Sequence, residues 1–332
     1  MDLTNKKILV TGADGFIGSH LVERLVAKGA DVRAFVFYNF QGRNGWLDSL
    51  ADSVLKSVEI VSGDIRDPNG VFQASANCDV IMHLAALIGI PFSYHSPDSY
   101  IDTNIKGTLN ILNAARIHNT TKVVITSTSE VYGTALYVPI DENHPLQGQS
   151  PYSASKIGAD QLALSFYRSF HTPVTIIRPF NTYGPRQSAR AVIPSLFVQL
   201  MNGKKDLSVG NLNTTRDFTF VTDTVEGFIK IVEAENVLGE VVNLGVNSEI
   251  SVKDLLEKIS HIVGVKANII ISNERIRPKN SEVERLWSNN QKAKQLINWS
   301  PSVLLEKGLQ MTYNWFLVKE NMQLYNSNRY YI

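Results

Sequence analysis

The sequence has little of several features that mark special classes of protein. Cys78 is the only cysteine among 332 residues, which excludes an internal disulfide and any metal site built from several cysteines, and agrees with a reducing compartment. The 32 Lys and Arg residues nearly balance the 31 Asp and Glu residues, so the net charge is only +1. Such a balance gives no electrostatic basis for binding nucleic acid or an anionic membrane, and we expect neither partner.

Long apolar runs and targeting signals are also missing. The longest apolar stretch, residues 80–92, is interrupted by His83 and is shorter than the roughly 20 residues that a membrane-spanning helix needs. The N-terminus passes from polar residues directly into a short apolar run, without the regions of a secretory signal. We therefore expect a cytoplasmic protein. Its 44% hydrophobic and 19% charged residues are typical of an ordinary globular protein.

What the first half of the chain does have is a regular alternation of strand and helix patterns. Helices are predicted at about 16–28, 98–117 and 152–170, between short β-branched runs at 7–11, 32–36, 58–62, 80–85, 122–127 and 174–178. The runs are apolar nearly throughout, as strands covered on both faces should be. This alternation predicts an α/β fold with a doubly wound parallel sheet and right-handed crossovers.

After residue 178 the pattern breaks into shorter elements with interspersed Arg, Asn, Gly and Pro. Residues 241–245 still have the composition of a strand of the main sheet. We therefore predict a dinucleotide-binding domain at 1–180, to which about 219–245 returns, and a smaller discontinuous lobe made of 181–218 and 246–332. No Pro- or Ser-rich linker separates the two parts, so we expect them to pack closely.

A glycine-rich segment, TGADGFIG, follows the first predicted strand and opens the first predicted helix. Gly12, Gly15 and Gly18 would permit a tight turn and bring backbone N–H groups close to a pyrophosphate at the helix N-terminus. Phe16 and Ile17 lie in the same turn. The spacing is GxxGxxG and not the usual GxGxxG, but its position predicts a dinucleotide site and hence a Rossmann-like sheet.

The choice between NAD and NADP stays open in the sequence. An acidic residue usually ends the second strand of an NAD-binding fold, but this chain has Val36, Phe37, Tyr38 and Asn39 there. NADP is therefore permitted, and Arg43 is either a counter-charge for its 2′-phosphate or a solvated loop residue. Further cofactor contacts are predicted after the third and fourth strands, at Asp64, Ile65, Leu84, Ala85 and Ala86.

Tyr152 and Lys156 are four residues apart, which on a helix places them on one face. A neighbouring ammonium and the positive nicotinamide of an oxidised cofactor would depress the pKa of the phenol, so Tyr152 could act as a base. Thr128 and Glu130 follow the fifth predicted strand, where open α/β sheets place their ligand crevice. His83 ends the fourth strand and is interpreted as a hydrogen-bonded structural histidine.

The motifs TGADGFIG, GDIRD, HLAA, TNIKGT, STSEVYG, YSASK and RPFNTYGPR occur in this order and resemble the extended short-chain dehydrogenase/reductase family of nucleotide-sugar enzymes. The Thr-x-Glu after the fifth strand resembles that of the sugar-nucleotide 4,6-dehydratases, with Ser129 where dTDP-glucose dehydratases have Asp. A narrower similarity, carried by RAFVFYN, HSPDSY and RPKNSEVERLW among other segments, is to dehydratases of nucleotide-linked N-acetylglucosamine in bacterial legionaminic-acid and related pathways.

The resemblance implies a mechanism for these residues. Tyr152 removes the proton of the carbon-4 hydroxyl while NAD or NADP, tightly bound and regenerated each turnover, accepts the carbon-4 hydride. Lys156 holds the ribose, and Thr128 bonds the carbon-4 oxygen. Glu130 removes the carbon-5 proton, water leaves from carbon-6, and the hydride returns to carbon-6. The missing Asp leaves open which acid protonates the leaving hydroxyl; Glu130 is our preferred candidate.

The partner implied by the resemblance is a nucleotide-diphosphate sugar, most like UDP- or GDP-N-acetylglucosamine. Charge-assisted donors suit phosphate oxygens, so we predict diphosphate contacts at Asn181, Arg186, Arg216 and Arg285, and no metal. The apolar segment 87–92 either borders the sugar or packs in the core. The family also implies a homodimer. A nucleotide-sugar 4-epimerase is the nearest alternative, a reductase is the third, and a catalytically silent dinucleotide sensor is the most remote.

Overall fold

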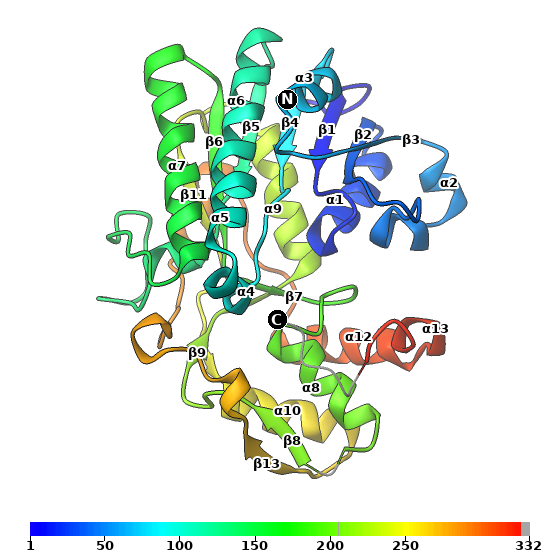
Figure 1. Ribbon diagram of the computed structural model, residues 1–332, viewed down its shortest axis with the longest axis vertical. Coiled ribbons are helices and arrows are strands. Elements are labelled where there is room, and N and C mark those ends of the chain that lie inside the picture. Colours follow the sequence, from blue (N-terminus) through cyan, green and yellow to red (C-terminus); the bar gives the residue numbers. More distant parts are fainter. Residues whose placement is uncertain (205, 327–332) are drawn as a thin grey trace.

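A computed structural model of the protein describes residues 1–204 and 206–326. Within these residues the larger part is built on a seven-stranded, entirely parallel sheet (Figure 1). Its strands, in sheet order, are β11 (Val241–Leu244), β6 (Val174–Pro179), β5 (Lys122–Thr126), β4 (Val80–His83), β1 (Lys7–Thr11), β2 (Asp31–Phe37) and β3 (Val58–Gly63). The order reverses between β1 and β4, where doubly wound sheets bind ligands. The predicted Rossmann-like fold is confirmed.

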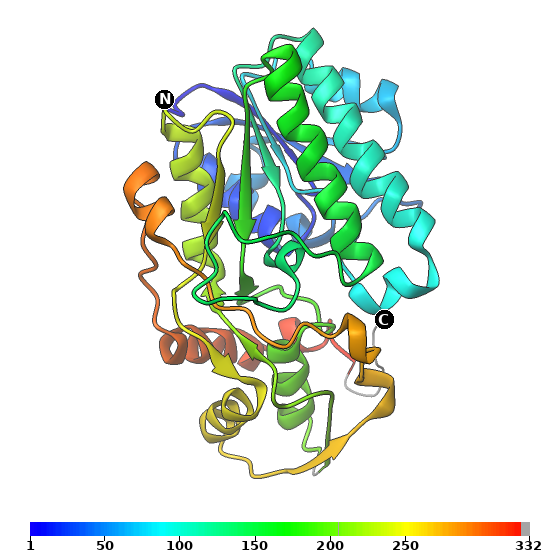
Figure 2. The same ribbon diagram turned by 90° about the vertical axis from the view of Figure 1, so that its left-hand side faces the viewer.

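Helices cover both faces of this sheet (Figures 1 and 2). Because side chains alternate along a strand, Ile8 and Val10 of β1 belong to one core cluster and Leu9 to another. The first cluster includes apolar side chains of α1 (Phe16–Ala27) and α9 (Val221–Glu233). The second is covered by α3 (Pro68–Ser75), α6 (Gly107–Ile117) and α7 (Pro151–Phe170).

The predicted helix at about 98–117 is in fact three pieces. It comprises α5 (Pro97–Tyr100), a π-helical turn (Ile101–Lys106) and α6. The π turn contains Asn104, whose side chain bonds both backbone groups of Leu87 and the hydroxyl of Ser155, each at 2.9 Å. Single π turns of this kind often occur at functional sites, and this one fastens the segment after β4 to α7.

Two predicted strands also end earlier than expected. The strand predicted at 80–85 ends at His83, and the hydroxyl of Thr11 accepts hydrogen bonds from the backbone N–H groups of Leu84 and Ala85 at 3.2 Å each. The strand predicted at 122–127 ends at Thr126. The chain leaves the sheet at the same edge after both strands, so the residues that follow β4 and β5 come together at that edge.

The smaller part lies below the sheet in Figure 1 and consists of short strand pairs and helices. The pairs are β7 (Asn181–Tyr183) with β10 (Phe218–Phe220), β9 (Thr215–Arg216) with β12 (Ile250–Ser251), and β8 (Asp206–Val209) with β13 (Asn268–Ile271). The helices of this part are α8 (Val192–Met201), α10 (Val252–Val263), α12 (Leu305–Leu317) and α13 (Lys319–Met322). In contrast, α11 (Gln291–Ile297) contacts β11 of the main sheet. The predicted second lobe runs to residue 332, of which 327–332 lie outside the described residues.

The remaining elements are short. They are α2 (Asp52–Leu55), α4 (Ile90–His95) and the 3-10 turns Gly45–Ser49, Ser129–Tyr132, Asn273–Arg275 and Lys279–Ser281. Across residues 1–204 and 206–326, none of the helices combines the length and the apolar character needed to cross a bilayer.

Candidate active site

A large cavity separates the carboxyl edge of the main sheet from the smaller lobe. It encloses about 1210 Å³ and is lined by the glycine loop, by residues after β3, β4, β5 and β6, by the start of α7, and by α8 and β8 of the lobe. A typical site for one small ligand has roughly 300–1,000 Å³. The cavity therefore has room for a dinucleotide and a second ligand side by side.

The glycine loop at one end of the cavity fits a dinucleotide. Gly12 has a positive φ of 67°, and a Cβ atom there would lie 2.8 Å from the backbone nitrogen of Ala85. A Cβ atom on Gly18 would overlap the carbonyl oxygen of Gly12. Only glycine allows this close packing, which leaves the N-terminus of α1 open to the cavity at Gly15, Phe16 and Ile17.

The other predicted cofactor residues line the same end. Asp64 and Ile65 follow β3, and Leu84, Ala85 and Ala86 follow β4. The carboxylate of Asp64 forms hydrogen bonds with the guanidinium of Arg66, which lowers the pKa of Asp64. Arg43 is exposed and is not among the residues that line the cavity.

Tyr152 and Lys156 enter the cavity from the first turns of α7. The helix begins with a capping box in which Ser150 and Ser153 satisfy each other's backbone N–H groups, with Pro151 at the first helical position. Both functional side chains are buried, and the ring of Tyr152 packs edge-on against Tyr100 with centroids 6.2 Å apart. The cap thus fixes where the predicted base and ammonium stand.

The depression of the Tyr152 pKa that we expect from Lys156 together with an oxidised nicotinamide stays a prediction; in the protein alone, burial is the main influence. Burial raises the pKa of Tyr152, and the opposing hydrogen bond with Thr128 is the weaker influence. Burial also lowers the pKa of Lys156 to about 8, although Asp160 acts in the opposite direction. The ammonium of Lys156 donates to the carbonyl of Thr126 at 2.5 Å. Desolvation is thus the largest influence on the pKa of each group.

Thr128 and Glu130 lie where the sequence places them, beside Tyr152. Thr128 caps the 3-10 turn Ser129–Tyr132, and its hydroxyl accepts a hydrogen bond from the backbone N–H of Glu130 at 3.2 Å. Glu130 is only 9% exposed, yet it lines the cavity with Thr128 and Tyr152. Its negative charge raises the pKa of Arg216, although burial of that guanidinium lowers it more. A carboxylate, a phenol and a hydroxyl thus share one part of the cavity.

His83 does not line the cavity. Its imidazole is buried between the hydroxyls of Thr11, at 2.8 Å, and Thr108, at 3.2 Å. Burial lowers the pKa of His83 to about 3, so the ring is neutral at physiological pH. These contacts support its interpretation as a structural histidine.

Three of the four predicted diphosphate residues line the cavity, and one does not. Asn181 lies on β7 with its side-chain oxygen buried and without a hydrogen-bond partner among the described residues. Arg186 is tied to α1 through the carboxylate of Glu23 at 2.6 Å, so it faces the cofactor end. Arg285 does not line the cavity: its guanidinium is exposed and pairs with the carboxylate of Glu249.

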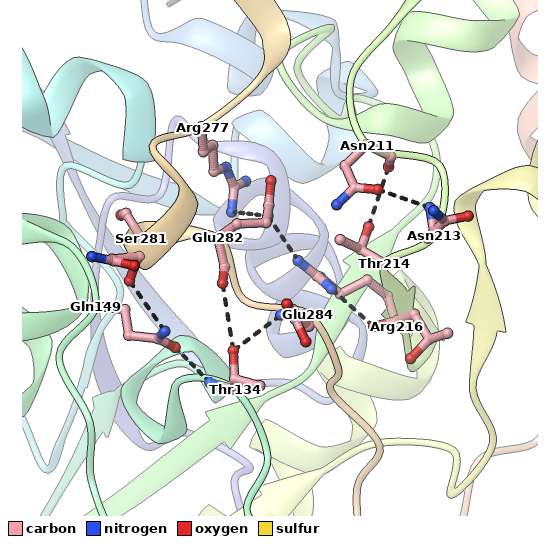
Figure 3. Close-up of polar contacts among 12 residues, drawn as sticks. Thr134, Gln149, Asn211, Asn213, Thr214, Arg216, Arg277, Ser281, Glu282 and Glu284 are labelled. Carbon is pink, nitrogen blue, oxygen red and sulfur yellow. Dashed lines mark hydrogen bonds and ion pairs between the residues drawn. The ribbon is translucent and has the colours of Figure 1, made fainter.

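Among the charged residues of the cavity that the sequence analysis missed are Arg277 and Glu282. Figure 3 shows the carboxylate of Glu282 between two guanidinium groups, 3.6 Å from that of Arg216 and 3.5 Å from that of Arg277. All three side chains line the cavity. The only signal for them in the sequence was the segment RPKNSEVERLW, which contains both missed residues and also Arg285.

The apolar segment 87–92 also lines the cavity. Tyr100 donates a hydrogen bond from its hydroxyl to the carbonyl of Gly89, and the N-terminus of α4 follows. Of the two interpretations of this segment, bordering a ligand agrees with its position.

Comparison with known proteins places this architecture in a family. The model of the GDP-mannose 4,6 dehydratase family matches residues 9–312. A putative UDP-glucose 4-epimerase of Methanocaldococcus jannaschii is 32% identical over 313 residues, which are 93% of this chain and 97% of the relative. A UDP-N-acetyl-alpha-D-glucosaminuronate decarboxylase of Bacillus cytotoxicus is 33% identical over 326 residues, 95% of this chain and 99% of the relative.

A solved structure supports the same assignment. DesIV, a dTDP-glucose 4,6-dehydratase of Streptomyces venezuelae crystallised with NAD bound, superposes with a TM-score of 0.88 at 28% identity, covering 97% of this chain and 100% of that one. The similar proteins thus include epimerases, decarboxylases and dehydratases that share one fold. The chain belongs to the NAD-dependent nucleotide-sugar dehydratase and epimerase family of extended short-chain dehydrogenases/reductases.

Proposed function

We propose that this protein is a nucleotide-sugar 4,6-dehydratase that converts UDP- or GDP-N-acetylglucosamine to the 4-keto-6-deoxy sugar with loss of water. The observation that carries the proposal is the shared position of Glu130, Thr128 and Tyr152 in one part of the cavity. Oxidation at carbon 4 needs only Tyr152 and the cofactor. Elimination of water across carbons 5 and 6 needs an additional base, and Glu130 has the chemistry for it.

Tyr152 would act at the carbon-4 hydroxyl. When bound, NAD supplies the redox chemistry at carbons 4 and 6 of the sugar. The phenolate of Tyr152 takes the proton of the hydroxyl, and the hydroxyl of Thr128 bonds the same oxygen. Because burial raises the pKa of Tyr152, the phenolate needs compensating positive charge. Lys156, one turn along α7, can provide it.

Glu130 would perform the step that defines a dehydratase. A ketone at carbon 4 acidifies the proton on carbon 5, and the Glu130 carboxylate takes that proton. The protonated Glu130 then gives it to the departing carbon-6 hydroxyl, which leaves as water. The elimination therefore needs no external acid, in agreement with Ser129 at the place where dTDP-glucose dehydratases have an Asp. Carbon 5 of the product takes the proton that Tyr152 removed from the carbon-4 hydroxyl, so the overall reaction balances.

The lobe would hold the nucleotide diphosphate. We assign this role to Arg216 and Asn181, joined by Arg277, because these donors line the cavity on the side away from the glycine loop. The apolar segment 87–92 would border the sugar. We further propose a cytoplasmic homodimer formed through α6 and α7; a monomeric mass in light scattering would contradict that assembly.

Two alternatives arise from the relatives. A 4-epimerase, the activity in the name of the M. jannaschii relative, needs no base at carbon 5, so Glu130 would have no role. A decarboxylase would bring a substrate carboxylate next to Glu130, and two adjacent anions repel each other. Both alternatives leave the buried carboxylate of Glu130 without a favourable function.

Mass spectrometry separates the three reactions. The purified protein is incubated with UDP- and GDP-N-acetylglucosamine, GDP-mannose, dTDP-glucose and UDP-N-acetylglucosaminuronate, without added reductant. Loss of one water from an N-acetylglucosamine nucleotide is the expected result. Loss of carbon dioxide from the uronate would establish a decarboxylase. Unchanged masses together with a new carbon-4 epimer in the NMR spectrum would establish an epimerase.

A further inference from the structure

The cofactor end of the cavity contains a carboxylate that the proposed reaction does not use. Asp14, in the middle of the glycine loop, lines the cavity and forms no ion pair within the described part of the chain. We infer that Asp14 accepts a hydrogen bond from the 2′-hydroxyl of the adenosine ribose and excludes a 2′-phosphate, which makes the site selective for NAD over NADP. The inference rests on the dinucleotide site of the proposed function.

The usual residue for this task is missing. In NAD-binding sheets an acidic side chain at the end of the second strand bonds the ribose. Here β2 ends at Phe37, followed by Tyr38 and Asn39, and the side chains of Phe37 and Tyr38 are exposed. The end of β2 therefore offers no carboxylate of its own.

The backbone brings Asp14 to the place where that carboxylate would be. The N–H groups of Gly12 and Ala13 donate to the carbonyl of Phe35 at 3.1 and 3.4 Å, so the glycine loop runs along the end of β2. Asp14 follows directly, and hydrogen bonding to the backbone of Phe37 influences its carboxylate. Asp14 thus belongs to the glycine loop that follows β1, but its carboxylate lies beside the end of β2.

The loop after β2 closes over Asp14 from the other side. The backbone N–H of Trp46 donates to the Asp14 carbonyl at 2.9 Å. Gly45 has a φ of 59°, and a Cβ atom there would lie 2.9 Å from the Cβ atom of Asp14. This glycine lets the loop pack against Asp14, and burial raises the pKa of the Asp14 carboxyl. The carboxylate is thus held in the cavity wall.

The neighbouring charges do not compensate for Asp14. Arg66 also lines this end, but its guanidinium already donates three hydrogen bonds to the carboxylate of Asp64, at 2.9, 3.0 and 2.5 Å. Arg43 is exposed and does not line the cavity. A 2′-phosphate would therefore meet an uncompensated carboxylate, whereas a 2′-hydroxyl could donate to it.

Calorimetric titration of the protein with NAD⁺ and with NADP⁺, in the absence of any sugar nucleotide, tests this inference. We expect NAD⁺ to bind at least tenfold more tightly, and Asp14→Asn to reduce the ratio of the two dissociation constants by about tenfold. Because the discrimination is electrostatic, the ratio for the unmodified protein should also fall as salt concentration rises. Any nucleotide that copurifies is identified by mass spectrometry after denaturation.

The matched control is Asp31→Asn, which removes a negative charge at the opposite end of β2 and should leave the ratio unchanged. Arg43→Ala should also leave it unchanged. Equal binding of both cofactors by the unmodified protein would overturn the inference, as would an unchanged ratio in Asp14→Asn. If that variant does not fold, the salt dependence of the ratio of the two dissociation constants, measured on the unmodified protein, still tests the inference. Binding without substrate keeps this result separate from the identity of the reaction.

Discussion

The guanidinium of Arg216 lies 3.6 Å from the carboxylate of Glu282, and both groups line the cavity. Arg277 shares the same carboxylate at 3.5 Å. Glu282 thus partly neutralises two arginines that stand where the proposed diphosphate would bind. Its backbone is held as well, because the carbonyl of Glu282 and the N–H of Glu284 both bond the hydroxyl of Thr134 (Figure 3).

Glu282→Gln should therefore strengthen binding of a nucleoside diphosphate. Removing the negative charge leaves the positive charges of Arg216 and Arg277 less compensated, so the dissociation constant of UDP or GDP should fall several-fold at low salt. Arg216→Gln should weaken binding by about tenfold or more. Calorimetry with each nucleotide measures both changes. Arg285→Gln, at the surface, is the control and should leave the dissociation constant unchanged.

Tyr152→Phe should abolish turnover while the fold and cofactor binding persist. The substitution removes the phenol that takes the carbon-4 proton but keeps the ring that packs against Tyr100. We expect the rate constant to fall by roughly 10²–10⁴-fold, the usual contribution of a positioned acid or base. Product formation followed by mass spectrometry gives the rate, and circular dichroism checks the fold. Activity equal to that of the unmodified protein would remove Tyr152 from the mechanism.

Glu130→Gln should stop the reaction after oxidation at carbon 4. The amide cannot accept the carbon-5 proton, so the yield of dehydrated product should drop by about 10²-fold or more. A transient absorbance of reduced cofactor should then accumulate. Glu284→Gln, an exposed acid of the adjacent segment, is the matched control. A normal yield of dehydrated product in Glu130→Gln would show that another group performs the elimination.

The stability of the protein should decrease as the pH falls from about 6.5 toward 3, partly because of His83. Burial lowers the pKa of His83 to about 3 in the folded protein, whereas the unfolded chain titrates near 6.5. In this window the unfolded state binds a proton that the folded state does not, so the free energy of unfolding falls by up to ~1.4 kcal/mol per pH unit.

His83→Asn tests this contribution. The amide can still bond one of the two threonine hydroxyls that hold the ring, but it does not titrate. Urea unfolding at several pH values should give a shallower dependence of the free energy of unfolding on pH than in the unmodified protein. His20, whose pKa burial lowers to about 4, remains in the variant and should preserve part of the slope. An identical slope in both proteins would contradict the assignment.

The local sequence alone determined the main sheet and the centre of the site. The alternation of strand and helix patterns and their composition predicted the strands, and the glycine spacing predicted the loop after β1. The positive φ of Gly12 and the close packing of Gly18 show why this loop needs glycine. The i, i+4 spacing of Tyr152 and Lys156 on α7 and the position of Glu130 after β5 likewise follow from local rules. Each of these features depends on residues that are near one another in the chain.

Only the tertiary structure decided which distant charges meet in the cavity. Arg216 and Glu282 are far apart in sequence, and their contact depends on how the segment after β13 returns along β9. Arg285, three residues beyond Glu282, faces the surface instead. Asp14 gains its position from β2 and Gly45. Burial is also the main influence on the pKa of Tyr152 in the protein alone, since desolvation depends on everything packed around a group and not on its neighbours in the chain.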